Sequence, residues 1–444
     1  MQQKAHEVFD FLAIGVGPFN LGLACLTEPL TDVKGLFLDK KERFNWHPGM
    51  LIEGATLQIP FMADLVTLAD PTNPFSFLNY LKEQGRIYSF YIKEDFLLLR
   101  KEYNKYCQWA IQKLDSVRFQ TEVKEIVYSD TEECYIVITE NTKTKEAHFY
   151  KTRKLVLGTG TQPYIPKCCK SLKDKAVHSS KYLPNKEVLQ QKKSITIIGS
   201  GQSAAEIFYD LLQEIDNKNY ELNWVTRSSR FFPLEYSKLT LEMTSPEYVD
   251  YFYKLPKAKR NHLINNQKHL YKGINQDLIA AIFDLLYTKQ LNKKNKIKLR
   301  TNSELQKVVY DDTLGSFYLE LHQHEQNTHY KNQCEGLILA TGYGYQTPEF
   351  VSSIIDRILW DEKGRYEVNR NYSIDENGNE IFVQNAELHT HGFVTPDLGM
   401  ACYRNSYIIK ELTGINHYPI EKRIAFQQFG PTEEELIETQ KLVQ

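Results

Sequence analysis

The stretch VFDFLAIGVGPFNL, residues 8–21, decides the fold, because it joins an apolar run to a glycine-rich turn and then to helical spacing. An apolar run that ends in Gly15-Val16-Gly17 is typical of a buried strand followed by a tight turn. In such a turn the first glycine permits the sharp bend, and the second lets a pyrophosphate group approach the backbone at the helix N-terminus. The stretch therefore predicts a β–α unit that binds a nucleotide.

A second glycine turn, Gly199-Ser200-Gly201, begins 184 residues after the first. It follows an apolar run at 194–198, and a helical pattern continues from it to about Leu212. A further apolar run comes after each unit, at 35–38 and at 222–226. The pair predicts the α/β class, with two Rossmann-like dinucleotide-binding domains.

The residue that closes the second strand of each unit distinguishes the two nucleotides. Asp39 lies 24 residues after the first glycine of its turn, where a carboxylate accepts hydrogen bonds from ribose hydroxyls, and together with Pro18 it favours FAD. Arg227 lies 28 residues after the start of the second turn and is followed by Ser228. An arginine there attracts a ribose 2′-phosphate, which favours NADPH over NADH. A tight turn with no ligand is the alternative for either motif taken alone.

The two units divide the chain into an interrupted FAD-binding domain and an NADPH-binding domain. We predict the first part of the FAD-binding domain at 1–184, the NADPH-binding domain at 185–335, and the second part of the FAD-binding domain with a C-terminal tail at 336–444. Residues 231–290 are polar, aromatic and poor in glycine, and we predict that they form a small helical insertion that caps the substrate site.

Shorter elements are predicted from local patterns. Residues 135–139 and 147–151 have the alternation of antiparallel strands, and 154–157 form a further predicted strand. Residues 185–193 are polar and are predicted to be a linker, whereas 308–322 have the pattern of a hairpin.

The composition excludes several classes of function. Lys and Arg number 54 against 56 Asp and Glu, a formal net charge of -2, so neither nucleic acid nor an anionic membrane is an expected partner. The chain has no apolar run of roughly 18 residues and no apolar signal region at its N-terminus, so we expect a cytoplasmic protein. None of the seven cysteines forms a CxxC pair, and no metal-ligand spacing is present, so no metal site is predicted.

Six further segments narrow the interpretation. They read WHPGM at 46–50, LQIPF at 57–61, DLVT at 64–67, PTNPFSF at 71–77, LATGY at 339–343 and HTHG at 389–392. Together with the two glycine turns, they resemble the class B flavin-dependent N-hydroxylating monooxygenases, the lysine, ornithine and diamine N-monooxygenases of siderophore biosynthesis. The matching pieces span most of the chain, and one departure is Glu335, where the family usually has an aspartate.

The resemblance implies FAD on the first turn, NADPH on the second, and a set of residues for each. For FAD these are Gly15, Gly17, Pro18, Phe19, Asn20 and Asp39 of the first unit, Trp46, His47, Met50 and Gln58 along the flavin, Thr341 and Gly342 at a domain junction, and Pro396 and Leu398 beside the pyrimidine ring. For NADPH they are Gly199, Gly201, Gln202, Ser203, Arg227 and Ser228. Gln58 is also the candidate catalytic residue. Plain core packing is the alternative for Trp46, His47 and Met50.

The resemblance also implies the reaction. NADPH reduces FAD, O2 forms a C4a-hydroperoxyflavin, and a neutral primary amine takes up its distal oxygen to become a hydroxylamine. Such a site must exclude water and bind the amine with its lone pair free, which desolvation promotes. No protein nucleophile is needed. Because relatives are often tetramers, a homotetramer is a further expectation.

Two departures from the family pattern concern the amine. Members that use lysine or ornithine hold the substrate with a Lys before the position of Asp64 and with a downstream Ser, and here these positions are Ala63 and Gly399. A lost charge-assisted contact weakens carboxylate binding by roughly 1.5 to 3 kcal/mol, so we predict an amine without an α-carboxylate, putrescine or cadaverine. Histamine, or L-lysine or L-ornithine, is the alternative. Glu235 is a candidate acceptor for the second ammonium, with a surface residue of no role as its alternative.

Other two-nucleotide flavoproteins are competing interpretations. A flavin disulfide reductase needs a dithiol beside the flavin, usually CxxC, which the sequence lacks. A Baeyer–Villiger or S-oxygenating enzyme carries FxGxxxH before its NADPH motif, and residues 172–178 keep only His178. A non-catalytic nucleotide-binding protein would bind both cofactors without amine-dependent use of oxygen.

Overall fold

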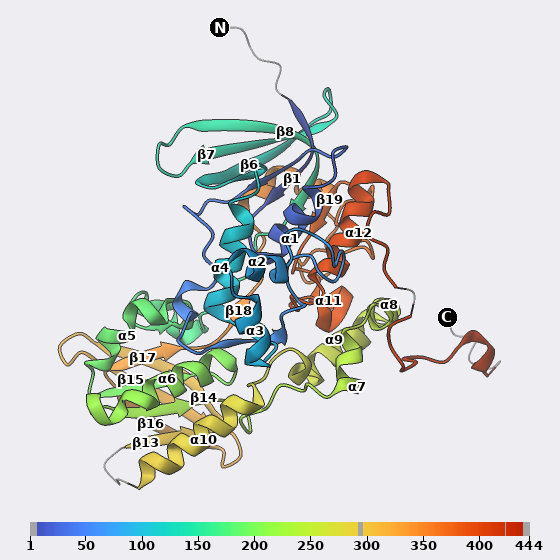
Figure 1. Ribbon diagram of the computed structural model, residues 1–444. Helices are drawn as coiled ribbons and strands as arrows, with labels where there is room; N and C mark the ends of the chain where they lie inside the picture. The colour runs from blue at the N-terminus through green and yellow to red at the C-terminus, as the bar shows by residue number, and fades with distance from the viewer. Residues whose placement is uncertain (1–6, 292–295, 422, 438–444) are drawn as a thin grey trace.

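Two β-sheets, each built on one of the glycine-rich turns, organise the chain (Figure 1). The computed structural model describes residues 7–291, 296–421 and 423–437. The prediction of an α/β protein with two Rossmann-like units is confirmed by these sheets. Of the predicted C-terminal tail, residues 438–444 lie outside the described residues.

The first sheet has the strand order β5-β2-β1-β8-β7-β6, and β19 also pairs with β8. Its strands are β1 (Val8–Ile14), β2 (Gly35–Leu38), β5 (Val117–Arg118), β6 (Thr121–Ser129), β7 (Cys134–Asn141), β8 (Ala147–Leu157) and β19 (Ile381–Val383). β1 runs parallel to β2 and β8, and Ile14 is in register with both Leu38 and Leu157. These three strands therefore end together at the edge of the sheet that carries the first glycine turn.

Strand β8 is longer than predicted. The antiparallel strands predicted at 135–139 and 147–151 are confirmed as parts of β7 and β8. The separate strand predicted at 154–157 is wrong, because β8 continues without a break to Leu157. The strand pairs with β7 up to Thr152 and with β1 from Lys151 onward, so its backbone stays hydrogen-bonded throughout.

The second sheet is parallel, with the order β10-β17-β11-β12-β13. Its strands are β10 (Val177–His178), β11 (Ser194–Ile198), β12 (Glu221–Val225), β13 (Ile297–Arg300) and β17 (Gly336–Leu339). β10 and β17 lie outside 185–335 on either side, so the sheet extends beyond both predicted limits of the NADPH-binding domain. A three-stranded sheet of β14 (Ser303–Asp311), β15 (Ser316–Gln323) and β16 (Thr328–Cys334) confirms the hairpin predicted at 308–322.

The predicted linker at 185–193 is wrong for most of its length, because helix α5 spans Tyr182–Gln190. Tyr182 and Leu189 are buried in the core of the second unit. The Tyr182 hydroxyl donates a hydrogen bond to Asp210 of helix α6 (Gln202–Lys218) at 2.5 Å. Only one face of α5 is apolar, which is why its composition resembles that of a linker.

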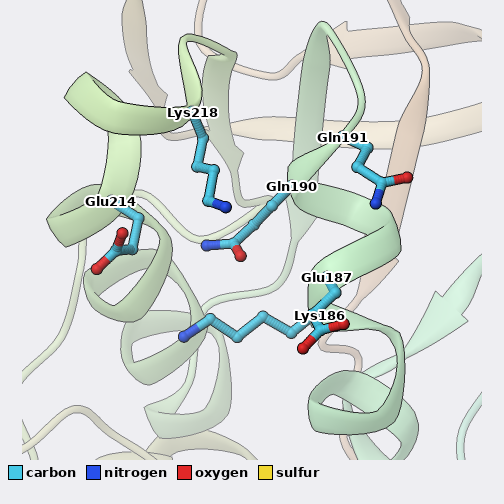
Figure 2. A pocket seen from close by; sticks show the side chains of 6 residues that line it. All are labelled: Lys186, Glu187, Gln190, Gln191, Glu214 and Lys218. Atoms are coloured by element: carbon cyan, nitrogen blue, oxygen red, sulfur yellow. The ribbon is translucent and has the colours of Figure 1, made fainter.

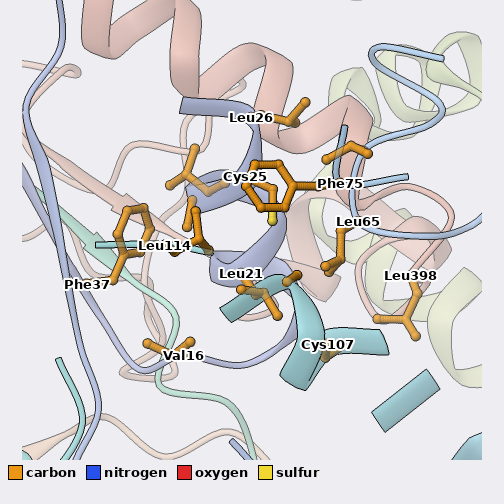
Figure 3. Packing of buried hydrophobic residues seen from close by; sticks show 14 of the residues in the cluster. Val16, Leu21, Cys25, Leu26, Phe37, Leu65, Phe75, Cys107, Leu114 and Leu398 are labelled. Atoms are coloured by element: carbon orange, nitrogen blue, oxygen red, sulfur yellow. The ribbon is translucent and has the colours of Figure 1, made fainter. Parts of the chain in front are cut away.

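Helix α1 (Pro18–Thr27) is buried on nearly all sides. Leu21 and Leu26 have no exposed surface, and Figure 3 shows them packed with Leu65 and Phe75. Helices α4 (Arg100–Ile111) and α12 (Ala401–Thr413) also pack against α1. A helix that is apolar all round is held in the core, so the glycine turn at its N-terminus has a fixed position.

The segment at 231–290, predicted to be helical, contains α7 (Lys238–Leu241), α8 (Pro246–Lys254), α9 (Lys257–Asn266) and α10 (Gln276–Gln290). In Figure 1, α8 and α9 lie next to α11 (Leu388–His391), whereas α10 packs along α6. The segment therefore spans from the second unit to the first. Over the described residues, we find no helix with the length and apolarity needed to cross a bilayer.

Short elements complete the described chain. They are α2 (Phe77–Glu83), α3 (Ile87–Lys93), and two small antiparallel pairs, β3 (Thr56–Pro60) with β4 (Leu97–Leu99) and β9 (Gln162–Pro163) with β18 (Tyr343–Gly344). The β9–β18 pair joins the segments that follow β8 and β17, so it lies where the chain passes between the two units.

Candidate functional site

The first glycine turn has one glycine packed against the chain and one facing open space. Gly15 has φ +88°, and a Cβ atom there would lie 2.4 Å from the carbonyl oxygen of Gly158. No atom lies within 4 Å of the Cβ position of Gly17. The space beside Gly17 adjoins the N-terminus of α1, whose partial positive charge favours a phosphate group. The turn therefore fits the pyrophosphate of a dinucleotide.

Asp39 and Asn20, both predicted to contact the cofactor, brace this turn. The Asp39 carboxylate accepts hydrogen bonds from the Val16 and Lys41 N–H groups, both at 2.8 Å. The Asn20 amide donates to the Gly15 carbonyl at 2.7 Å and accepts from Gln384. Both side chains are therefore hydrogen-bonded to other parts of the chain, and these bonds hold the turn in its shape.

The second turn repeats this arrangement. A Cβ atom on Gly199 would lie 2.3 Å from the carbonyl oxygen of Ala340, whereas the Cβ position of Gly201 has no neighbour within 4 Å. The Gln202 amide accepts from the Asn275 N–H at 2.8 Å and donates to Glu206 at 2.9 Å. Gln202 therefore joins the start of α6 to the start of α10. Ser203 is half-buried in the first turn of α6.

A cluster of cations lies beyond the end of β12. The side chain of Arg227 is 73% exposed, and its nearest carboxylate is Glu304 at 3.9 Å. Burial lowers the pKa of Lys272, and the charges of Lys268 and Arg227 lower it further. The three cations therefore lie close together, beside Ser228, whose N–H donates to Thr226. Lys268 and Lys272 were missed in the sequence because they follow Arg227 by some 40 residues and carry no motif.

Trp46 and His47 lie in a row of aromatic rings between the two units. The His47 ring is 4.8 Å from Trp46 and 5.5 Å from Tyr343, and Tyr343 is 5.4 Å from His178. Burial, with the charges of Arg100 and Lys41, lowers the pKa of His47 to about 4. His47 is therefore uncharged at neutral pH.

Met50 and Gln58, both predicted to lie along the flavin, are buried or half-buried. Met50 is 3% exposed and packs in the core of the second unit, although it precedes β3 of the first. The half-buried Gln58 amide donates to the Thr56 carbonyl at 3.1 Å. The hydroxyl of Thr341 donates to the Tyr164 carbonyl, and the Gly342 carbonyl is 3.1 Å from His178 Nε2. The 341–343 segment thus lies at the junction, next to WHPGM.

Four buried side chains linked to α1 or α12 carry polar atoms that lack hydrogen-bonding partners. These atoms are Nε and Nη1 of Arg404, Oγ1 of Thr395, Oε1 of Gln384 and Oδ1 of Asn405, within the described residues. The Arg404 guanidinium lies 4.7 Å from the Phe19 ring centre, and Asn405 donates to the Phe19 carbonyl at 3.1 Å. Unpaired buried polar atoms are unfavourable unless a ligand or water meets them. The chemistry of these atoms fits a polar, planar ring system such as a flavin.

The predicted substrate positions Ala63 and Gly399 lie together. The Cβ atom of Ala63 is 3.5 Å from the Cβ position of Gly399, and Oδ1 of Asp397 is 3.2 Å from the same point. Asp397 was missed as a site residue, because its signal is this proximity and not a motif. Glu235 is exposed, and its backbone N–H donates to the His269 carbonyl at 3.1 Å. Of the predicted flavin contacts nearby, Pro396 is exposed and Leu398 is 9% exposed.

A polar hollow of about 350 Å³ lies away from these groups (Figure 2). Its lining residues come from α5 and the C-terminal half of α6: Lys186, Glu187, Gln190, Gln191, Glu214 and Lys218. The glycine turn is at the opposite end of α6, a helix of 17 residues. The hollow is therefore separate from the nucleotide cradles.

The sequence model of the L-lysine 6-monooxygenase/L-ornithine 5-monooxygenase family matches residues 7–345 of this chain. A putrescine N-hydroxylase of Shewanella oneidensis is 51% identical over 427 residues, 96% of this chain and 85% of that protein. A putrescine N-hydroxylase of Acinetobacter baumannii is 46% identical over 434 residues, 98% of this chain and 96% of that protein.

Among solved structures, a crystal structure of DfoA from Erwinia amylovora bound to FAD matches with a TM-score of 0.94 and 57% identity, covering 96% of this chain and 99% of that chain. DfoA is described there as the cadaverine monooxygenase of the desferrioxamine biosynthetic pathway.

Proposed function

This chain belongs to the L-lysine 6-monooxygenase/L-ornithine 5-monooxygenase family, and from that premise we propose that it uses FAD, NADPH and O2 to N-hydroxylate putrescine or cadaverine for a hydroxamate siderophore. The observation that carries the choice of amine is the contact between Ala63 and Gly399, which leaves no cation for a substrate carboxylate at either position. The names of the relatives at about half identity, two putrescine hydroxylases and a cadaverine monooxygenase, support the same class.

The residues of both turns fit their cofactors. The turn at Gly15 and Gly17 would hold FAD, with the unpaired buried polar atoms of Arg404, Thr395, Gln384 and Asn405 as further partners, and the turn at Gly199 and Gly201 would hold NADPH. The bound flavin supplies the transfer of one oxygen atom from O2 to the amine. The chain's own contribution is to position the amine and to exclude water.

The proposed function is tested by measuring amine-dependent NADPH oxidation together with hydroxylamine formation. The substrates are putrescine, cadaverine, histamine, L-lysine and L-ornithine. We expect the two diamines to give the highest kcat/KM. A preference for either amino acid would overturn the choice of amine, and purified protein that bound both cofactors but used oxygen no faster with any amine would overturn the enzymatic function.

The free thiols of the described cysteines suit the reducing cytoplasm in which we place the protein.

Ala63→Lys is expected to raise the KM for the diamine about tenfold. Ala63 is 7% exposed and borders Gly399, so a lysine ammonium there would repel the ammonium of the substrate at short range. Ala63→Met, which adds comparable length without charge, is the matched control. The KM of both variants is measured with cadaverine; equal increases would mean that side-chain size, and not charge, matters at this position.

Arg227→Ala is expected to raise the KM for NADPH roughly 10- to 100-fold, because charge-assisted contacts to a phosphate contribute about 1.5 to 3 kcal/mol each. Lys272→Ala should act in the same direction, since Lys272 belongs to the same cationic cluster. The control is NADH, which lacks the 2′-phosphate, and its KM should change little in either variant. An equal effect on both nucleotides would show that the cluster does not hold the 2′-phosphate.

A further inference from the structure

We propose that Asp397 binds the second ammonium of the substrate and thereby selects diamines over monoamines and amino acids. The inference rests on the proposed function. It assigns a specificity-determining role to a residue that lies next to both Ala63 and Gly399.

The geometry brings an anionic oxygen and two small residues to one point. Oδ1 of Asp397 accepts the N–H of Gly399 at 2.8 Å and lies 3.2 Å from the Cβ position of that glycine. The Cβ atom of Ala63 is 3.5 Å from the same position. Any larger side chain at 399 would meet the carboxylate, so the glycine leaves the Asp397 oxygen accessible to a small cation.

The charge of Asp397 has no close counter-ion in the described part of the chain. Oδ1 accepts the Gly399 N–H, and no basic side chain of the described residues lies within 4.0 Å of either oxygen. Arg404 is the cation that acts on it, but the Arg404 guanidinium is paired with Glu387 at 2.8 Å. Asp397 is half-buried, and desolvation raises the pKa of its carboxyl, as expected for a carboxylate with no cation beside it. A substrate ammonium would supply that partner.

The position suits a substrate because parts of both units meet there. Leu65, two residues after Ala63, lies against α1, with its carbonyl 2.8 Å from the Cβ position of Gly22. On the other side, the charge of Asp397 contributes to raising the pKa of Tyr236, which follows the second unit's β12 in the helical insertion. Asp397 therefore lies beside the Ala63 segment and near enough to Tyr236 for its charge to act there, so a diamine held at Asp397 would face residues of both segments.

Asp397 fits this role better than Glu235. Glu235 is exposed, whereas Asp397 lies with Ala63 against the Cβ position of Gly399. A purely structural role for Asp397, in shaping the turn through the Gly399 N–H, is the competing explanation. The two roles are separable, because an asparagine keeps Oδ1 as the acceptor for that N–H and removes only the charge.

The test compares wild type, Asp397→Asn and Glu235→Gln, with cadaverine and pentylamine as substrates. Pentylamine has the same chain length but no second ammonium. In Asp397→Asn we expect the KM for cadaverine to rise on the order of 10- to 100-fold, as for other lost charge-assisted contacts, with little change for pentylamine. Because both amines must lose a proton to react, the diagnostic quantity is the ratio of kcat/KM for cadaverine to kcat/KM for pentylamine. In wild type this ratio should fall as the pH drops and Asp397 becomes protonated, and Asp397→Asn should lack the fall in the ratio.

Three outcomes would overturn the inference: an equal change for both amines, a wild type that does not prefer cadaverine to pentylamine, or a selective loss in Glu235→Gln alone. Calorimetric binding of cadaverine to the NADP+-loaded holoenzyme distinguishes this inference from the proposed function. If cadaverine bound in a way that depends on Asp397 but was not hydroxylated, the proposed function would be overturned and the role of Asp397 in binding the ammonium would stand. Hydroxylation of cadaverine that is unaffected by Asp397→Asn would do the reverse.

Discussion

Gly17→Val is expected to give a folded protein that retains almost no FAD. The Cβ position of Gly17 has no neighbour within 4 Å, and its φ of -93° and ψ of 179° are open to any residue, so the empty protein can accept a side chain. The isopropyl group would occupy the space beside the helix N-terminus. Losing two or more charge-assisted bonds of about 1.5 kcal/mol each would weaken FAD binding at least ~100-fold. Flavin absorbance after gel filtration measures the loss.

Gly201→Val is the matched comparison, because the Cβ position of Gly201 is equally open. It should keep FAD and lose affinity for NADPH, the reverse of Gly17→Val. Gly15→Ala, in contrast, would place a Cβ atom 2.4 Å from the Gly158 carbonyl and should lower the melting temperature itself. If Gly17→Val retained FAD at the wild-type level, the first turn could not be the pyrophosphate cradle.

The glycine turns could be predicted from the sequence because their geometry is local. The strand, the bend and the start of the helix all lie within about 20 residues, so the sequence shows where a side chain cannot fit. Gly15 is such a position, because a Cβ atom there would meet Gly158. The error at β8 has the opposite cause. The local sequence at 152–153 does not indicate that the strand continues. β8 continues there because it exchanges one neighbouring strand, β7, for another, β1.

The site was predictable only where a residue's role depends on its own segment. Asp39 follows β2 as predicted, yet its carboxylate also holds the Val16 N–H, which spacing alone cannot reveal. Lys272 and Asp397 had no motif to mark them. Each lies in its site because packing brings it to residues far away in the chain, next to Arg227 in one case and Ala63 in the other. These long-range contacts are set by the assembled fold.

Arg100→Met is expected to lower the free energy of unfolding by about 3–5 kcal/mol, the effect of removing one partner of a buried ion pair. Arg100, at the start of α4 in the first unit, makes two hydrogen bonds of 2.8 and 2.7 Å to Glu206 of α6 in the second. It also donates to the Met50 carbonyl at 2.9 Å. Its loss would leave the Glu206 carboxylate buried between the units, with Gln202 as its one remaining donor among the described residues. Urea unfolding followed by circular dichroism measures the change.

Two variants separate the charge from the packing. Lys101→Met removes an exposed ion pair, between Lys101 of the same helix α4 and Glu53, and should cost about 1 kcal/mol or less. The double variant Arg100→Met/Glu206→Met should recover most of the loss, because it leaves no buried charge unpaired. If Arg100→Met were no more destabilising than Lys101→Met, the contact between α4 and α6 would not contribute to stability as a buried pair. The two nucleotide-binding units would then be held together chiefly by apolar contacts, such as those of Met50 with the second core.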